Sequence, residues 1–367
     1  MIGTLPRDPF RFEPLPTRVL FGHGTRTHLA KEVRAAGITR VLVLTTPFQK
    51  DLGDAVARDL GDVVAGVFNG AAMHTPTDVT AQALDALTTA GADGVVAVGG
   101  GSTIGLGKAL AARTDVVQVV LPTTYAGSEM TPILGETENG LKTTRSGPEI
   151  RPEVVIYDVA LTHTLPAAMS VTSGINAIAH AVEALYAVNG NPLMDALALE
   201  GIRALTGALP LIVADPHRGA GREAALYGAW LCGTCLGSVG MALHHKLCHT
   251  LGGSFGLPHA ETHTVVLPHA LAYNAPAVPK VIDALRPILG DDPALGLHHL
   301  ARDLGAPTSL SGLGLDAASL DRATELALQA RYPNPRPLEA GALRATLGRA
   351  WAGTAPISEI SSEGSSA

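Results

Sequence analysis

Histidines are the residues of this chain whose type and spacing most clearly suggest chemistry. His245 and His249 are four residues apart, and an earlier segment carries Asn176 and His180 at the same spacing. Residues four apart lie on one face of a helix, one above the other. Two such helices could therefore gather these side chains, together with the later His259, around one pocket.

This pocket lacks the carboxylate that would complete a metal site. Neutral imidazole is the commonest protein ligand of zinc and iron, but the position that would supply an acidic ligand holds Asn176. An amide carries no negative charge and binds a cation far more weakly. We therefore expect no bound metal and four histidines that titrate near pH ~6–7. A core seldom gathers so many polar rings; the roles of His244 and His263 stay open.

The composition is that of a folded, acidic protein. Its 367 residues are enough for two domains with substantial cores, and 46% hydrophobic with 16% charged residues excludes a disordered chain. The net charge of −7 argues against nucleic acid or an anionic membrane as a partner. We find no apolar stretch of 18 or more residues and no signal peptide, and so expect a cytoplasmic protein without a membrane span.

The cysteines suit a reducing compartment and suggest no metal site. The chain has three of them, and Cys232 and Cys235 form a C-x-x-C pair within a run of small and apolar residues. No second pair exists to complete a zinc site, and no strand precedes the pair as a redox motif would need. We therefore predict that the pair is buried packing.

The pattern of elements changes near residue 160. Before it, short apolar runs alternate with helical patterns, which is typical of a parallel sheet covered by helices. The predicted strands are 18–22, 40–47, 63–68, 94–98, 118–122 and 154–157, and helices are predicted at 27–36, 79–90, 170–188, 192–209 and 222–236. We predict an α/β domain over 1–160, an all-α domain over 161–357, a hinge near 158–166 and a frayed tail over 358–367.

A glycine-rich turn follows the predicted strand 94–98. Gly99, Gly100 and Gly101 precede Ser102 and the start of a helical pattern. Glycines let backbone N–H groups approach an anion without interference from Cβ atoms, and a helix N-terminus adds about half a positive charge. The dinucleotide fingerprint is not matched, because Ile104 stands where its third glycine belongs. We interpret the turn as a pyrophosphate cradle; a merely tight turn is the alternative.

A second polar cluster follows the predicted strand 118–122. Thr123, Thr124 and Ser128 lie at its C-terminal end, where open α/β sheets bind ligands. Their hydroxyl groups could hold phosphate oxygens or an amide, although an ordinary capping turn is the alternative. Two such clusters together favour a dinucleotide.

Taken in order, these segments resemble the iron-containing alcohol dehydrogenase superfamily, related to dehydroquinate synthase, and within it the maleylacetate reductases. The resemblance runs from about residue 18 to residue 337. The segments that carry it are 44–47, 73–76, 99–108, 123–131, 173–186, 225–230, 244–249, 258–263 and 334–337.

The resemblance implies a dehydroquinate synthase-like α/β domain, an all-α domain, a homodimer, and reduction of maleylacetate to 3-oxoadipate with NADH or NADPH during aromatic degradation. It places Thr45, Thr46 and Pro47 near the adenine ribose, without an acidic residue to reject a 2′-phosphate. It also places Lys142 near the cofactor phosphates, because the metal-dependent relatives use a lysine in this region.

The resemblance also bears on the metal. In the metal-dependent relatives an Asp and three His bind iron or zinc, and their positions map onto Asn176, His180, His245 and His259. Those relatives usually carry an Asp where this chain has Gly105. The maleylacetate reductases share both departures, so the resemblance implies catalysis without a metal.

The implied reaction suits a pocket of protonatable side chains. Maleylacetate is a dianionic enone, and hydride addition to the alkene carbon distant from the ketone leaves an enolate that needs a positive or protic partner. A histidine or a lysine could serve, and a nearby substrate carboxylate would raise histidine pKa values. Lys246 could hold one carboxylate, although it points about 100° away from His245 on an ideal helix and a solvated face is the alternative. Arg336 is a weaker candidate, in a proline-rich turn.

Three other functions remain consistent with the sequence. One is a metal-dependent alcohol or polyol dehydrogenase in which Asn176 still binds the ion. Another is a catalytically silent scaffold or small-molecule sensor, against which the intact cradle and histidines argue. The third is a reductase of a related enone or keto acid in a biosynthetic pathway.

Overall fold

The computed structural model describes residues 9–138, 141–217, 219–329 and 332–358. The chain divides into two compact units. We call residues 14–166 with 216–238 the α/β unit, and residues 1–13 and 167–215 with 239–367 the helical unit. The expected tail falls almost wholly outside the described residues, which end at Ser358.

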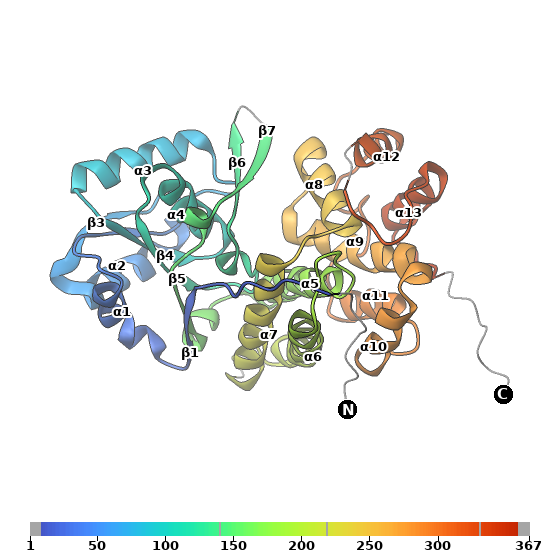
Figure 1. Ribbon diagram of the computed structural model, residues 1–367, viewed down its shortest axis with the longest axis horizontal. Helices are drawn as coiled ribbons and strands as arrows, with labels where there is room; N and C mark the ends of the chain where they lie inside the picture. Colours follow the sequence, from blue (N-terminus) through green and yellow to red (C-terminus); the bar gives the residue numbers. More distant parts are fainter. Residues whose placement is uncertain (1–8, 139–140, 218, 330–331, 359–367) are drawn as a thin grey trace. The chain divides into compact units, whose positions relative to one another are not determined.

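A six-stranded parallel sheet forms the centre of the α/β unit (Figure 1). Its strand order is β1-β8-β5-β4-β2-β3. Its strands are β1 (Arg18–Gly22), β2 (Val41–Leu44), β3 (Val64–Phe68), β4 (Gly94–Gly99), β5 (Val117–Pro122) and β8 (Val154–Asp158). Each coincides with a strand predicted from the sequence, so the predicted fold of this part is confirmed. Strands β2, β4 and β5 are neighbours, which places the loops that follow them at one edge of the sheet.

Helices cover both faces of this sheet, which explains why its central strands are apolar on both sides. Helices α1 (Leu29–Ala35) and α2 (Lys50–Leu60) share a core with one set of alternating strand residues, such as Val43 and Val96. Helix α4 (Gly101–Thr114) packs on the other face, since a Cβ on Gly107 would lie 3.5 Å from the Cβ of Ala97. Helix α3 (Thr77–Ala90) packs beside α4.

An antiparallel hairpin that we did not predict is inserted before β8. Strands β6 (Ile133–Glu138) and β7 (Leu141–Ser146) pair with each other and not with the main sheet. Polar and charged residues make up half of β6 and most of β7, so the segment lacks the apolar run that identifies the other strands.

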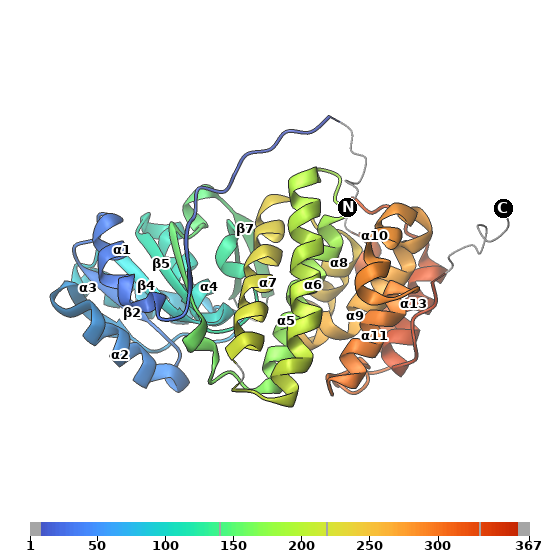
Figure 2. The same ribbon diagram turned by 90° about the horizontal axis from the view of Figure 1, so that it is seen from below.

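The helical unit contains helices only, as predicted, within the part of the chain that the structure describes (Figure 2). Its longer members are α5 (Ala167–Ala184), α6 (Pro192–Ala214), α8 (Leu243–Phe255), α9 (His259–Asn274), α10 (Pro279–Leu289), α11 (Pro293–Asp303), α12 (Ser319–Gln329) and α13 (Ala340–Ala352). Helix α5 packs on α6 and α9, and α8 packs on α9.

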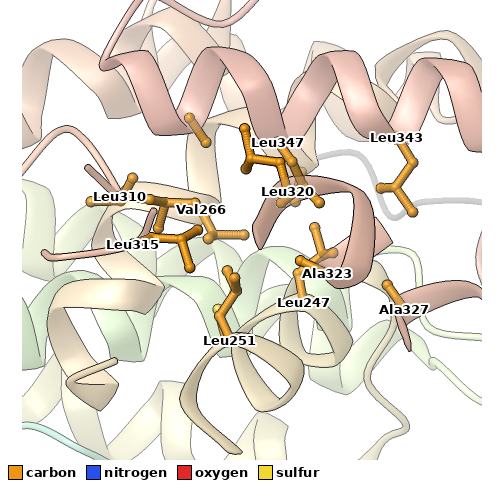
Figure 3. Packing of buried hydrophobic residues seen from close by; sticks show 14 of the residues in the cluster. Leu247, Leu251, Val266, Leu310, Leu315, Leu320, Ala323, Ala327, Leu343 and Leu347 are labelled. Atoms are coloured by element: carbon orange, nitrogen blue, oxygen red, sulfur yellow. The ribbon is translucent and has the colours of Figure 1, made fainter. Parts of the chain in front are cut away.

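One apolar cluster fixes the orientation of α8. Leu247 and Leu251 of α8 pack with Val266 of α9, Leu320 of α12 and Leu347 of α13 (Figure 3). All five side chains are at most 3% exposed. Because residues of a helix face different directions, burying the leucines here turns the histidines of α8 toward α5 and α9.

Helix α6 is the one described helix with the length and composition of a membrane span. Half of its most apolar window is buried inside the protein, and it packs against α5 and α10. An apolar helix in the core of a folded domain has the same properties.

Helix α7 (Gly219–Ser238) belongs to the α/β unit, which differs from the expected boundary near residue 160. Arg222 is fully buried and donates to the carbonyl oxygens of Leu165 at 2.8 Å and Pro216 at 3.0 Å. A Cβ on Gly233 would lie 2.8 Å from the Cα of Gly127, so glycine permits direct backbone packing. These long-range contacts leave no periodicity in the sequence, and the boundary was therefore drawn without them. Cys232 and Cys235 are buried in this helix, as predicted.

Candidate active site

Two of the predicted histidines form a direct pair in the helical unit. Nδ1 of His180, on α5, lies 2.8 Å from Nε2 of His245, on α8, and the two ring centroids are 4.9 Å apart. Both side chains are buried, at 3% and 6% exposure. Burial and a direct ring-to-ring hydrogen bond make this pair a place where one proton can be passed between two imidazoles.

Glu183 completes the pair, and the sequence analysis missed it. Its carboxylate is fully buried, and Oε2 lies 2.7 Å from Nδ1 of His245. A carboxylate only accepts, so His245 carries a proton on Nδ1. The remaining Nε2 then faces His180. One signal was present in the sequence: a single acidic residue, three positions after His180, in a helix that contains no Lys or Arg.

The other two predicted histidines lie at the surface of this cluster. His249 is exposed, and its ring centroid is 6.2 Å from that of His245. His259 is also exposed, and its ring lies 4.3 Å from that of His263. The structure thus brings all four histidines into one neighbourhood, but only His180 and His245 form its buried centre.

His244 and His263 form a second, fully buried pair. Nε2 of His244 lies 2.9 Å from Nδ1 of His263, and the thiol of Cys248 lies 3.7 Å from His244. Burial lowers the pKa of both rings well below 6.5, and the neighbouring histidines lower them further. Both rings therefore stay neutral. The potential ligand atoms of these three residues lie within 4.8 Å of one another, but each ring leaves one nitrogen without a partner among the described residues, whereas metal-binding imidazoles are normally held by a second hydrogen bond.

The donor set around Asn176 does not fit a divalent metal. Asn176 is 2% exposed, and its Oδ1 has no hydrogen-bond partner among the described residues. It supplies no negative charge, and His180 and His245 direct ring nitrogens at each other. Hard and borderline cations need a charged oxygen or open imidazole lone pairs.

The two candidate substrate cations differ in their surroundings. Lys246 is half-buried on α8, directly after His245 in the chain. Arg336 stacks on Tyr273, 4.6 Å from the ring centroid, and donates to the Tyr273 carbonyl oxygen at 3.1 Å. The geometry of Arg336 favours the structural alternative, in which it holds the 334–337 turn.

The predicted cofactor residues of the α/β unit converge at one edge of the sheet. Thr46 follows β2, Gly99 ends β4 and Gly100 follows it, and Thr123 and Thr124 follow β5. Ser102 lies in the first turn of α4, and Ser128 begins a short 3₁₀ helix, η4 (Ser128–Met130). Sheets of this kind bind ligands at the carboxyl ends of neighbouring parallel strands, which is where these residues lie.

Gln49, which we did not predict, links three of these loops. It lies in the 3₁₀ helix η2 (Pro47–Gln49), and its Nε2 donates to Oγ1 of Thr123 at 3.0 Å. Its carbonyl oxygen accepts from Thr45, which is fully buried and therefore packs within the fold. A Cβ on Gly99 would lie 3.0 Å from Oε1 of Gln49.

The glycines of the cradle occupy their positions for different structural reasons. Gly99 has φ of +157°, and a Cβ on Gly100 would lie 2.8 Å from Cγ2 of Thr124. Gly101 starts α4, is exposed, and has open space where a Cβ would lie. A Cβ on Gly105 would meet the hydroxyl of Thr75. The free helix start at Gly101 is thus suited to an anion.

This region contains a buried lysine, Lys108, that we did not predict. Lys142 lies in β7, and its side chain is outside the described part of the structure. Lys108 of α4 is buried instead, and Nζ donates to Thr131 Oγ1 at 2.8 Å and to the carbonyl oxygens of Ser128 and Ile133. Burial lowers the pKa of Lys108 to about 7, and the charge of Glu129 opposes this shift.

Two family models match the chain. Residues 16–159 match the iron-containing alcohol dehydrogenase model, and residues 170–351 match the C-terminal model of the Fe-containing alcohol dehydrogenase family. The chain belongs to the iron-containing alcohol dehydrogenase family. It is therefore an oxidoreductase of an NAD(P)-dependent family, and the resemblance inferred from its segments is confirmed.

Relatives narrow the position within the iron-containing alcohol dehydrogenase family. The chain is 56% identical to maleylacetate reductase of Rhizobium sp. strain MTP-10005, over 95% of this chain and 99% of the relative. It is 53% identical to maleylacetate reductase of Delftia acidovorans, again over 95% and 99%.

Solved structures of maleylacetate reductases and of other family members are also similar to this chain. The crystal structure of maleylacetate reductase from Agrobacterium tumefaciens is 56% identical and has a TM-score of 0.93, covering 95% of this chain and 100% of that one. The iron-containing alcohol dehydrogenase of Corynebacterium glutamicum is 41% identical, with a TM-score of 0.89, covering 94% and 98%. A sulfoacetaldehyde reductase from Bifidobacterium kashiwanohense, solved with NAD+, is 22% identical and shares the fold, with a TM-score of 0.85.

Proposed function

We propose that this chain reduces the carbon–carbon double bond of maleylacetate to give 3-oxoadipate, with NADH or NADPH as the reductant. The observation that carries the proposal is the buried Glu183–His245–His180 relay, joined at 2.7 and 2.8 Å. The maleylacetate reductases that match over nearly the whole chain support the same reaction.

The relay supplies what the reaction lacks once hydride has been added. A bound reduced nicotinamide supplies the hydride, and the substrate is left as an enolate whose oxygen needs a proton. In the proposed step, Nε2 of His180 donates that proton. Nδ1 of His180 then takes a proton from Nε2 of His245, across the 2.8 Å hydrogen bond.

Glu183 balances the charge throughout this transfer. Before the transfer His245 is a cation beside a buried carboxylate, and afterwards it is neutral with Nδ1–H still bonded to Glu183. A buried charge is tolerated when it is paired and hydrogen-bonded. The net charge of the relay is zero before the transfer and −1 after it. A proton from solvent then restores the starting state.

We further propose that the reaction needs no metal. The support is chemical: Asn176 offers a neutral amide, and His180 and His245 are occupied with each other. Conjugate acceptance spreads the developing charge over the enone, so protic donors suffice where a simple carbonyl would need a stronger acid.

A metal-dependent alcohol dehydrogenase is the second candidate. The family name and the exposed His259, beside the buried histidines, favour it. In that case Asn176 would bind the ion through the Oδ1 that has no partner among the described residues.

The assembly and the surroundings of the enzyme also belong to the proposal. We propose a small dicarboxylate as the substrate, a homodimer in the cytoplasm, and no nucleic-acid or membrane partner. The net charge of −7 supports the last point, because polyanions repel such a surface.

A steady-state assay with maleylacetate decides between the candidates. The purified protein is tested with NADH and with NADPH, with and without EDTA, and its metal content is measured. We expect activity that EDTA does not change and no stoichiometric iron or zinc. Activity lost on chelation and restored by one metal would establish the second candidate, and no oxidation of either nicotinamide would reject both.

The His245→Ala variant tests the relay within the same assay. Without His245, the proton that His180 gives to the enolate is not replaced through the relay; positioned proton transfer typically contributes about 100-fold or more, so we expect kcat to fall by roughly that factor. His28→Ala is the matched control, because His28 is exposed in the α/β unit. Near-normal kcat in the folded His245 variant would place the chemistry elsewhere.

A further inference from the structure

We propose that Glu183 is a positioning residue that caps helix α8 and, with the same carboxylate, fixes the tautomer of His245. The proposal deepens the proposed function and rests on it for the catalytic consequence. The tautomer itself can be tested without any activity.

Helix α8 has no cap of its own. Its N-cap residue is Ala242, whose side chain cannot accept a hydrogen bond. Three backbone N–H groups at this end, of Ala242, His244 and His245, donate to the Glu183 carboxylate at 2.8, 2.7 and 3.4 Å. The cap thus comes from α5, 59 residues earlier for its bond to Ala242. A carboxylate is the group that a helix N-terminus favours most, because the helix dipole is positive there.

The cap and the tautomer are held by one group. Oε2 accepts from Ala242 N–H and also lies 2.7 Å from Nδ1 of His245. Because Oε2 is fixed by the start of the helix, the ring of His245 is held where Nδ1 must be the protonated nitrogen. Nε2 is then available to His180 in either protonation state of the pair.

No fixed cation competes for this carboxylate among the described residues. Its one ion pair in this part of the chain is with His245. The polar groups around it are otherwise neutral: the pKa values of Tyr186, Cys248 and Tyr332 are all raised, by burial first and by the charge of Glu183 second. His245, the ion-pair partner of Glu183, and the His180 ring bonded to it are the groups beside this carboxylate that can take up a proton.

A second layer holds the carboxylate from behind. Tyr186 shares a hydrogen bond with Glu183 and another with Asn274. Asn274 and Asn334 exchange two amide hydrogen bonds, at 2.7 and 3.0 Å, and Oδ1 of Asn334 accepts from the backbone N–H of Leu243 at 3.3 Å. The 334–337 turn therefore supports the start of α8, which gives a structural reason for that motif.

The test compares two carboxylates that cap helices. Glu183→Gln keeps the size of the side chain, removes its negative charge, and replaces one carboxylate oxygen with an NH2 group that can only donate hydrogen bonds. Asp292→Asn is the matched control, because Asp292 caps α11 through the N–H groups of Ala294 and Leu295 and touches no histidine of the relay. For each protein we would measure kcat, the KM for the nicotinamide, the melting temperature, and the tautomer of His245 by NMR of 15N-labelled histidine.

For Glu183→Gln we expect kcat to fall by about tenfold or more, the nicotinamide KM to stay within about twofold, and the Nδ1–H signal of His245 to be lost. For Asp292→Asn we expect a lower melting temperature with kcat and the tautomer unchanged. A folded Glu183→Gln protein with near-normal kcat, or with His245 still protonated on Nδ1, would overturn the proposal.

These experiments distinguish failure of the proposed function from failure of the proposed role of Glu183. If the unaltered protein does not reduce maleylacetate, the proposed function fails while the NMR measurement still tests the position of the proton. If Glu183→Gln does not fold, the unaltered protein decides: His245 without a proton on Nδ1 would overturn the proposal, and Nδ1–H would uphold it.

Discussion

The ammonium nitrogen of Lys108 lies 2.8 Å from the hydroxyl oxygen of Thr131, inside the α/β unit. Its other two acceptors are the carbonyl oxygens of Ser128 and Ile133, so the three donors of one lysine are matched by three acceptors of one loop. Lys108 lies on the helix that begins at the glycine cradle. The cradle and the second polar cluster are thereby tied together through one buried side chain.

Replacing this lysine should loosen the cofactor site. In Lys108→Met, up to three buried acceptors lose their donor, at about 1–3 kcal/mol each in the worst case. We expect a clearly lower free energy of unfolding and a Kd for reduced nicotinamide raised by about tenfold or more. Calorimetry and fluorescence titration measure the two effects. Lys280→Met, on the exposed surface of α10, is the control; equal behaviour of both variants would contradict the role of Lys108.

A side chain at Gly101 should block the anion without harming the fold. No atom lies within 4 Å of a Cβ placed there, so Gly101→Val fits the protein alone but occupies the space before the helix N-terminus. We expect the nicotinamide Kd to rise by about tenfold or more, with the melting temperature nearly unchanged. Gly341→Val, in the first turn of α13 and equally open, is the matched control. Unchanged affinity in the Gly101 variant would show that the cradle is misassigned.

Asn176→Asp should create a site for a divalent metal at the histidine cluster. A carboxylate beside the histidine cluster adds the missing charged ligand for zinc or ferrous iron. We expect bound metal to increase while kcat/KM for maleylacetate falls, because the new charge repels the dianionic substrate and the bound metal takes up the lone pairs of the histidines. The metal content measured by mass spectrometry should rise, and the kcat/KM measured by steady-state kinetics should fall. Asn191→Asp, which keeps the N-cap of α6, is the control. A variant with no metal and full activity would mean that the four positions do not converge.

His269 should make the protein acid-sensitive. Burial lowers the pKa of His269 to about 3, helped by the nearby His298 and Arg349, and neither ring nitrogen has a partner among the described residues. Its folded pKa lies below its unfolded value of about 6.5, so the unfolded state binds more protons between these values and stability falls as the pH drops through this window.

The slope from His269 is at most about 1.4 kcal/mol per pH unit. Urea unfolding of the parent and of His269→Leu, compared between pH 7 and pH 5, isolates it. We expect the variant to lose less stability on acidification than the parent. Parallel pH dependences would place the acid sensitivity on other groups, such as the neighbouring His298, whose pKa is also lowered by burial.

The sequence by itself determined the six strands of the main sheet, several of the helices and the places along the chain where two kinds of chemistry lie, but not the β6–β7 hairpin. Local signals are sufficient for this, because apolar periodicity sets strands and helices, and a strand followed by glycines and a helix sets an anion cradle. The four-residue spacing of Asn176 and His180, and of His245 and His249, correctly placed each pair on one helix.

Only the tertiary structure decided which of these residues act together. Glu183 meets the start of α8, Gln49 meets Thr123, and Arg222 draws α7 to the α/β unit, each across a long stretch of chain. Such contacts leave no period in the sequence. The same holds for burial: four histidines have equal status in the sequence, but the packing of Leu247 and Leu251 leaves His245 inside and His249 exposed. The orientation of α8 is fixed by its apolar partners, and that orientation assigns the histidines their different roles.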